Sequence, residues 1–364
     1  MTNVITELNQ VTPAWLTAVL TQNGALQAGH VTAIETADGR GNWSQNGVLK
    51  IQYSDDALGE RPLTLFLKLV DTDTGDGEYF DDSEVTYYTR DYVGVENAPL
   101  IRCYEGAYAA EQMRYHLLLE DLSDTHEECR YKEPTLEYGE ALAEGLAVLH
   151  AHWWGAERLT TAVAPIHPPE FMQRFVDIAA PGVEPIISHH AADLKPHWPA
   201  LMREIYAHHP QALIDRTKNA HGFTLIHGDV NPSNILAPKR GERPLYIIDR
   251  QPFDWSLTTW LGVYDLAYAM VLYWETDKRR ELERPILRHY HEQLYQHGVQ
   301  DYSWEQLWDD YRLCVAMGVY IATEWCRGGD TERWREIWMF ELRRSLTACD
   351  DLACAELWRP VASA

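Results

Sequence analysis

The chain has 364 residues, of which 46% are hydrophobic, and this composition excludes a disordered protein and allows one large or two moderate globular domains. Its 55 acidic residues outnumber its 31 basic ones, and the net charge of −24 disfavours nucleic acid and anionic membranes as partners. No segment approaches the ~20 apolar residues of a membrane span. The N-terminus lacks the basic and apolar regions of an export signal, so we expect a cytoplasmic protein with reduced cysteines.

The first 120 residues have the patterns of a mostly antiparallel sheet. Residues 12–24 predict a helix, with Thr12 as its cap and Pro13 in its first turn. A second helix, capped by Asp82 or Ser83, is predicted between the third and fourth strands. The predicted strands lie within 31–54 (two strands around a glycine-containing turn), 61–70, and 103–122 (two strands).

The composition becomes mainly helical near Leu122. Apolar residues at helical spacing predict a long helix that begins near residue 135 and that Gly155 ends. Beyond residue 256 we expect helices up to the C-terminus. The sequence therefore predicts an α+β protein with a small β-rich lobe, residues 1–120, and a larger α-helical lobe, residues 121–364.

One β-hairpin is predicted inside the helical part, where the runs ILA and LYIID flank the turn PKRGERP. Asn234 and Asp249 are equally far from its midpoint, so antiparallel pairing would place them opposite each other. Asp229 lies five residues before Asn234, on a loop that Pro232 stiffens. These polar groups are either ordinary turn residues or they converge on a divalent cation. Convergence is favoured because Asp249 directly follows a buried-looking run, where a charge is costly unless something binds it.

A lysine and a glycine-containing turn in the β-rich lobe add to this set. Lys68 lies inside the run LFLKLV, so it is either an edge-strand surface residue or a buried lysine with a partner. Its predicted partner is Glu84, with Glu78 as the alternative. Gly39 and Gly41 form a turn suited to cover phosphates, although such a pair is common by chance. Two oxygen ligands for Mg²⁺, a carboxylate and a lysine are the groups that phosphoryl transfer requires.

The stretch HGDVNPSNIL followed by YIIDRQ resembles the catalytic and metal-binding loops of aminoglycoside phosphotransferase and choline kinase-like small-molecule kinases. The resemblance extends, in the order of the family, to GRGN, LFLKLV, SEVTYY, LLLEDLS, LAVLHAHWWG and GVYDLAYAM. It is closest to the ecdysteroid kinase-like branch. The resemblance implies a bilobal protein kinase-like fold whose β-rich lobe covers a nucleotide.

The resemblance also implies roles for the polar residues of the hairpin region. Asp229 would be the catalytic base or would orient the substrate, and Asn234 and Asp249 would be the Mg²⁺ ligands. Asp265 would brace the catalytic loop, a role compatible with that of a simple helix cap. Arg250 departs from the family pattern, in which an aromatic residue is usual at this position. We expect Arg250 either to contact a phosphate or an acidic substrate or to change how the loop packs.

The nucleotide would be ATP or GTP, bound with Mg²⁺. Lys68 would contact the phosphates and pair with Glu84, and the backbone of the hinge would receive the adenine. By this resemblance the nucleotide-binding residues are Lys68, Glu84, Gly39, Gly41, Glu120 and Leu122.

The sequence leaves several functions open. The favoured one is a kinase for the hydroxyl group of a small cationic or hydrophobic molecule, bound by segments that include 254–260 and 322–330. A non-catalytic nucleotide-binding module is an alternative, and the acceptor type (choline or ethanolamine, antibiotic, or sterol) is undecided. A protein kinase is disfavoured because the fifteen residues between Asp249 and Asp265 leave no room for an activation segment.

Overall fold

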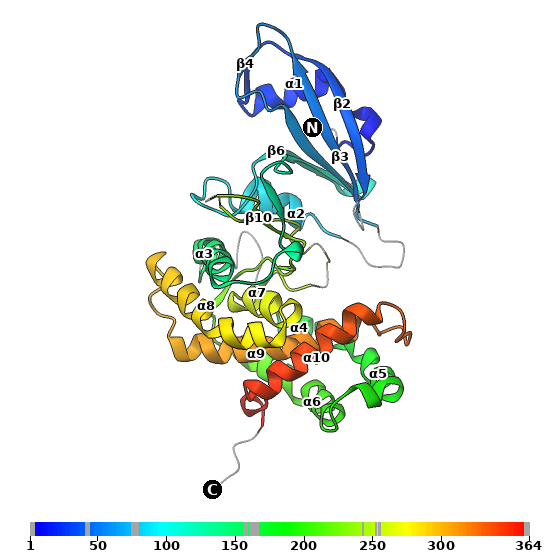
Figure 1. The fold of residues 1–364 in the computed structure, drawn as a ribbon, viewed down its shortest axis with the longest axis vertical. Coiled ribbons are helices and arrows are strands. Elements are labelled where there is room, and N and C mark those ends of the chain that lie inside the picture. Colours follow the sequence, from blue (N-terminus) through cyan, green and yellow to red (C-terminus); the bar gives the residue numbers. More distant parts are fainter. Residues whose placement is uncertain are drawn as a thin grey trace. The chain divides into compact units, whose positions relative to one another are not determined.

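The computed structural model describes residues 4–40, 44–73, 80–155, 159, 167–241, 244–251, 253 and 256–359. The chain forms two compact units (Figure 1). The first unit comprises residues 1–96, 100–127 and 236–254, and the second comprises 97–99, 128–235 and 255–364. Residues 236–254, which include most of the predicted hairpin, thus belong to the first unit. The sequence predicted a single boundary near Leu122, which would place the hairpin in the second unit.

The first unit is built on a five-stranded antiparallel sheet, as the sequence predicts. The spatial order places the third predicted strand, β5, in the middle of the sheet. From one edge to the other the strands are β2 (Val31–Arg40), β3 (Ser44–Tyr53), β5 (Thr64–Asp71), β7 (Arg114–Glu120) and β6 (Cys103–Ala109).

Helix α1 (Pro13–Gln22) packs against this sheet (Figure 1). Its predicted N-terminus is confirmed, because the Thr12 hydroxyl accepts the N–H of Trp15 at 3.1 Å and Pro13 occupies the first turn. The core of the unit consists of side chains from α1 and from the inner face of the sheet: Leu16, Val19, Leu20, Leu49, Ile51, Leu65, Leu67, Leu69 and Leu118.

The helix predicted after β5 is present but short. It consists of α2 (Ser83–Thr86) and a π-helical turn, η2 (Tyr87–Asp91). Asp82 occupies the N-cap position, one of the two predicted, but its side chain makes no capping bond, and the Ser83 N–H donates instead to Oδ1 of Asp81 at 2.7 Å. Asp82 has φ −90° and ψ 14°, whereas a capping residue needs an extended backbone.

Three smaller sheets complete the strands. The predicted hairpin is confirmed, since β10 (Ile235–Pro238) and β11 (Tyr246–Ile247) are hydrogen-bonded neighbours, and β8 (His126–Glu128) pairs with β10. Strand β1 (Leu26–Ala28) pairs with β4 (Leu58–Gly59). In the second unit β9 (Phe223–Leu225) pairs with β12 (Thr259–Leu261), so the expectation of helices alone beyond residue 256 is wrong. A three-residue run is too short to reveal its alternation in the sequence.

The second unit is otherwise helical. Helix α3 confirms the prediction, with Thr135 as its cap and Gly155 in a left-handed conformation (φ 54°) just beyond its end. None of the helices in the described residues combines the length and apolar composition that a membrane crossing requires. The helices are α3 (Leu136–Trp153), α4 (Pro169–Ala179), α5 (Val183–His190), α6 (Trp198–Arg216), α7 (Val263–Ala267), the π-helical turn η8 (Tyr268–Leu272), α8 (Thr276–Gln296), α9 (Trp304–Glu324) and α10 (Arg335–Asp351).

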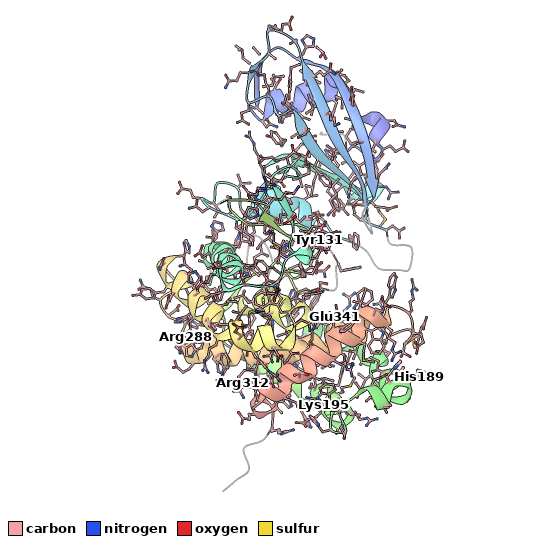
Figure 2. The ribbon with its side chains drawn as sticks, in the orientation of Figure 1. Tyr131, His189, Lys195, Arg288, Arg312 and Glu341 are labelled. Atoms are coloured by element: carbon pink, nitrogen blue, oxygen red, sulfur yellow. The ribbon has the colours of Figure 1, made fainter. Side chains whose placement is uncertain are left out.

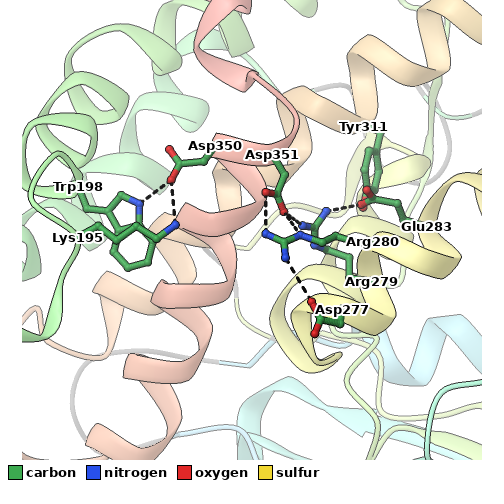
Figure 3. A network of polar contacts seen from close by, with 9 residues as sticks. All are labelled: Lys195, Trp198, Asp277, Arg279, Arg280, Glu283, Tyr311, Asp350 and Asp351. Carbon is green, nitrogen blue, oxygen red and sulfur yellow. Dashed lines mark hydrogen bonds and ion pairs between the residues drawn. The ribbon is translucent and has the colours of Figure 1, made fainter.

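Two adjacent acidic residues at the end of α10 join it to neighbouring helices (Figure 3). Asp350 accepts the indole N–H of Trp198, at the start of α6, at 3.0 Å. Asp351 forms ion pairs with Arg279 and Arg280 of α8, the latter through Nε at 2.8 Å. These contacts hold the C-terminal end of α10 within the second unit.

Candidate active site

Lys68 is a buried lysine with two carboxylate partners. Its Nζ lies 2.7 Å from Oε1 and 2.9 Å from Oε2 of Glu84, and 2.9 Å from Oδ1 of Asp249. Because β5 is the central strand, Lys68 is not the edge-strand surface residue that the sequence left open. The predicted pairing with Glu84 is confirmed, and Glu78 lies outside the described residues.

The electrostatics keep Lys68 charged. Burial alone lowers the pKa of Lys68, but the carboxylates of Asp249 and Glu84 outweigh it and raise the pKa above its usual value. Burial raises the pKa of Glu84, although the charge of Lys68 acts in the opposite direction. The Tyr115 hydroxyl also donates to Glu84, and burial raises the pKa of Tyr115, which keeps it a donor. The result is a fixed ammonium group at the centre of the first unit's sheet.

Asp249 lies two residues beyond the end of β11 and has a left-handed backbone with φ 58°, a conformation that costs about 1 kcal/mol for a residue other than glycine. Its side chain remains 46% exposed. Arg250 is buried, with its guanidinium 5.9 Å from the ring of Tyr87 and Nη1 3.4 Å from the backbone oxygen of Ser83. Of the two expectations for Arg250, these contacts support a packing role, in which it fixes the Asp249 loop against α2.

The second unit holds the predicted catalytic loop between β9 and β10. Oδ1 of Asp229 accepts the Tyr268 hydroxyl and the Asn231 side-chain amide, both at 2.9 Å. The Asn234 side-chain amide donates to Oδ2 of Asp229 and to its backbone oxygen, both at 3.0 Å. The structure thus brings Asp229 and Asn234 together as predicted. Asp249 belongs to the other unit, so its convergence with them stays a prediction.

Asp265 braces this loop, which confirms its predicted structural role. Its buried carboxylate accepts the backbone N–H of His227 at 2.7 Å and that of Gly228 at 2.9 Å. His150 lies 3.1 Å from the same carboxylate and 2.8 Å from the Tyr290 hydroxyl. Burial raises the pKa of Asp265, but the hydrogen bond and charge of His150 outweigh it and lower the pKa below its usual value. Gly228 has φ 84°, which favours glycine at this turn.

Sequence reasoning missed three of the residues in these networks. Tyr268 and Asn231 hold the Asp229 carboxylate, and His150 supports Asp265. Tyr268 follows Asp265 by three residues, a helical spacing that places both on one face and was a usable signal. His150 lies in a different helix, α3, and no local pattern connects it to the loop.

The donor atoms proposed for Mg²⁺ suit that ion. The described residues contain no cluster of three or more His, Cys, Asp or Glu side chains arranged to hold a metal. Mg²⁺ bound with a nucleotide takes only one or two protein ligands, because phosphates and water supply the others. The Asp249 carboxylate and the Asn234 carboxamide are hard oxygen donors. Asn234 turns its amide nitrogen to Asp229, which directs its carbonyl oxygen to the opposite side. Each of the two residues therefore offers a donor that suits Mg²⁺.

The remaining residues predicted to bind the nucleotide are Gly39, Gly41, Glu120 and Leu122. Gly39 is near the end of β2, and Gly41 lies outside the described residues. Glu120 ends β7, and its N–H donates to the backbone oxygen of Arg102 at 2.9 Å. The carbonyl of Leu122 accepts two backbone N–H groups from the following turn, both at 2.9 Å. The roles of these residues in nucleotide binding stay predictions.

Solved structures share this fold at low sequence identity. A choline kinase from Cryptosporidium parvum is 12% identical with a TM-score of 0.56, covering 89% of this chain and 91% of that one. An ethanolamine kinase from Plasmodium vivax is 12% identical with a TM-score of 0.51, covering 87% and 81%. A glucosamine kinase in complex with glucosamine, ADP and inorganic phosphate is 12% identical with a TM-score of 0.51, covering 94% and 97%. The fold is therefore the predicted α+β, protein kinase-like fold of small-molecule kinases.

The family model of the ecdysteroid kinase-like family matches residues 88–300. The chain belongs to this family, which confirms the resemblance seen in the sequence. No curated protein sequence matches the chain. The match includes the catalytic loop and Asp265 but begins after Lys68 and Glu84.

Proposed function

We propose that this protein transfers the γ-phosphoryl group of ATP or GTP to a hydroxyl group of a small molecule, with the help of Mg²⁺. The observation that carries the proposal is the ammonium of Lys68, which lies 2.7 Å from Glu84 and 2.9 Å from Asp249. A lysine buried in a central strand between two carboxylates suits the binding of a phosphate beside a metal ion. Membership of a kinase-like family supports the same reaction.

Three residues of the first unit have a role in this proposal. Lys68 neutralises phosphate charge, and Glu84 holds the ammonium in position from α2. Asp249 binds Mg²⁺ together with Asn234 of the second unit, so the proposal requires both residues to act on one ion. Mg²⁺ held by these residues would neutralise the charge that develops on the phosphates during transfer. The half-exposed carboxylate of Asp249 suits it to a ligand that arrives with the nucleotide.

Asp229 is the proposed catalytic residue of the second unit. It accepts or orients the proton of the attacking hydroxyl, so that the acceptor oxygen bonds to the γ-phosphorus while the bond to the nucleoside diphosphate breaks. Asn231, Asn234 and Tyr268 fix the orientation of its carboxylate by hydrogen bonds. Three donors on one carboxylate leave little rotational freedom, which is what a positioned base needs.

The nucleotide base is proposed to bind at the end of β7. Because the carbonyl of Leu122 already accepts two backbone N–H groups, adenine would accept the N–H of Leu122 and donate to the carbonyl of Glu120. The turn of Gly39 and Gly41 would cover the phosphates. None of the six cysteines, all of which lie in the described residues, forms a disulfide, which fits a cytoplasmic location with an ATP supply.

The acceptor is proposed to be a cationic or hydrophobic alcohol. Within the predicted segment 322–330, Trp325 is 38% exposed and lies 6.2 Å, ring to ring, from the exposed Trp334. Exposed aromatic rings bind apolar groups and cations. Asp254 and Trp255 of the other predicted segment lie outside the described residues.

A test of the function measures ADP release from Mg-ATP over a panel of hydroxylated small molecules. Asp229→Asn should lower turnover by ~10²–10⁴-fold and leave nucleotide binding intact, because the side chain keeps its shape and loses only its charge. Asp249→Ala should abolish the magnesium-dependent part of nucleotide binding in calorimetry. Asp177→Asn, an exposed carboxylate on α4, is the matched control and should change neither. Binding without turnover by the wild type, over the whole panel, would indicate the non-catalytic module instead.

A further inference from the structure

A buried carboxylate of the second unit, away from the loop, is connected to Asp229 by a chain of hydroxyl groups. Glu341 lies on α10 (Figure 2) and is only 3% exposed. Its Oε1 lies 3.4 Å from the Tyr273 hydroxyl, and its Oε2 accepts the indole N–H of Trp325 at 3.1 Å. The Tyr273 hydroxyl lies 3.5 Å from that of Tyr268, which donates to Asp229 at 2.9 Å.

The chain depends on a local departure from α-helical geometry. Tyr268 and Tyr273 are five residues apart, a spacing that an α-helix of 3.6 residues per turn would place on different faces. The π-helical turn η8 (Tyr268–Leu272) has a wider turn, which brings the two side chains together with ring centroids 5.7 Å apart. Such turns occur frequently at functional sites.

The burial of Glu341 shifts the pKa of its carboxyl group toward neutral pH. Burial raises the pKa of Glu341 to about 7, and the charge of Asp229 adds to this effect. The hydrogen bonds from Trp325 and Tyr273 and the charge of Arg344 act in the opposite direction on this pKa. Burial raises the pKa of both tyrosines well above its usual value, so each keeps its single proton.

The number of protons in the chain links Glu341 to Asp229. Tyr273 has one proton and two candidate acceptors, Glu341 and the oxygen of Tyr268. When Glu341 is ionised, the charged acceptor binds that proton more strongly. When Glu341 is protonated, it donates to Tyr273, Tyr273 donates to Tyr268, and every bond of the chain points toward Asp229. Aligned hydrogen bonds strengthen one another, so the Tyr268–Asp229 bond is stronger in this state.

We propose that Glu341 is a positioning residue that holds Asp229 in its productive orientation through Tyr273 and Tyr268. Protonated Glu341 completes the aligned chain, and ionised Glu341 withdraws the donor from Tyr268. This inference rests on the proposed function of Asp229. It assigns a role to a residue of the last long helix, outside the segment that the family model matches.

The first test is the pH dependence of Mg-ATP hydrolysis without an acceptor, measured as ADP release by the full chain. Wild-type turnover should fall by about two- to tenfold as the pH rises through 7, the equivalent of one hydrogen bond. Glu341→Gln should stay at the low-pH value throughout. Trp325 only donates, so it fixes the amide oxygen on its side and leaves the amide nitrogen to donate to Tyr273.

Two further variants complete this test. Tyr273→Phe, which keeps the Glu341 carboxyl group but breaks the hydroxyl chain, should lose the pH step and remain at the lower value. Glu336→Gln, an exposed carboxylate on the same helix, should retain the wild-type profile. A step near pH 7 that persists in Glu341→Gln or in Tyr273→Phe would overturn the inference.

The second test does not depend on turnover. The indole ¹⁵N–H resonance of Trp325, assigned with Trp325→Phe, should titrate with a midpoint near 7 because it contacts Glu341. Two charges about three hydrogen-bond lengths apart at an effective dielectric constant of 20 to 40 shift each other by about half to one pH unit. Asp229→Asn should therefore lower the midpoint by this amount, and an unchanged midpoint contradicts the coupling.

The titration also separates the failure of this inference from the failure of the proposed function. If the wild type hydrolyses no Mg-ATP and transfers no phosphate to the acceptor panel, the proposed function fails. The Trp325 resonance still decides whether Glu341 and Asp229 are coupled.

Discussion

The hydrogen bonds between Asp265 and the loop at residues 227–234, the predicted catalytic loop, give a prediction whose size follows from the structure. Asp265 offers two carboxylate oxygens, to the N–H of His227 at 2.7 Å and to that of Gly228 at 2.9 Å. Asp265→Asn retains one oxygen and replaces the other by an NH₂ group. One loop N–H must then face a donor in a fully buried position.

The cost has two parts. A buried N–H without an acceptor costs about 1–3 kcal/mol, and the remaining bond loses its charged acceptor, which costs about 1 kcal/mol more. We therefore expect Asp265→Asn to lower the free energy of unfolding by about 2–4 kcal/mol. The loop should also open more often, which lowers the protection of its amides.

Urea denaturation followed by circular dichroism measures the first effect, and amide hydrogen exchange at His227 and Gly228 measures the second. Tyr290→Phe is the matched control, because it removes the hydroxyl that contacts His150 and leaves both loop bonds in place. It should cost about 1 kcal/mol without changing exchange at these two amides. The reasoning is refuted if Asp265→Asn leaves both the stability and the loop exchange at wild-type values.

Other predictions concern groups away from this loop. Burial lowers the pKa of His209 to about 4. The neutral imidazole therefore contributes stability that is fully present above pH 6.5. As the pH falls through 4 the free energy of unfolding should drop by up to about 3 kcal/mol. His209→Gln should flatten this part of the stability–pH curve in urea denaturation, and a curve parallel to the wild type would contradict the assignment. Gly182→Ala places a Cβ 2.0 Å from the backbone oxygen of Thr323 and should cost about 3 kcal/mol. Gly139→Ala should cost less, because the atoms nearest to its Cβ belong to the side chains of Ile286 and Trp274, which can move more readily than a backbone oxygen. Equal melting temperatures for the two variants would disprove this ranking. Glu84→Gln removes the charge that faces Lys68 and should lower the free energy of unfolding by about 2 kcal/mol. Urea denaturation measures this cost, with the exposed Glu336→Gln as the control. A cost below about 0.5 kcal/mol would show that Asp249 alone suffices as the partner of Lys68.

The sequence predicted the elements whose signals are local. Helix α1 was predictable because Thr12 and Pro13 act within one turn of the chain, and the sheet strands because alternation repeats every two residues. The absence of a side-chain cap on α2 was not predictable from the sequence. The backbone angles of Asp82 decide whether its side chain can cap the helix, and residue type does not reveal these angles. The pairing of β9 with β12 was missed for a related reason, since three-residue strands are defined by their partner.

The sequence HGDVNPSNIL predicted that Asp229 and Asn234 lie together, and the structure shows this contact. The pairing of Lys68 with Glu84 was one of two alternatives predicted from the sequence. Those residues stand close in sequence to recognisable turns and strands, where spacing limits the possible partners. The contacts of Asp265 with His150, and of Glu341 with Tyr273, join helices far apart in the chain. Only tertiary packing decides such contacts, because burial and hydrogen bonding between distant segments leave no periodic signal in the sequence.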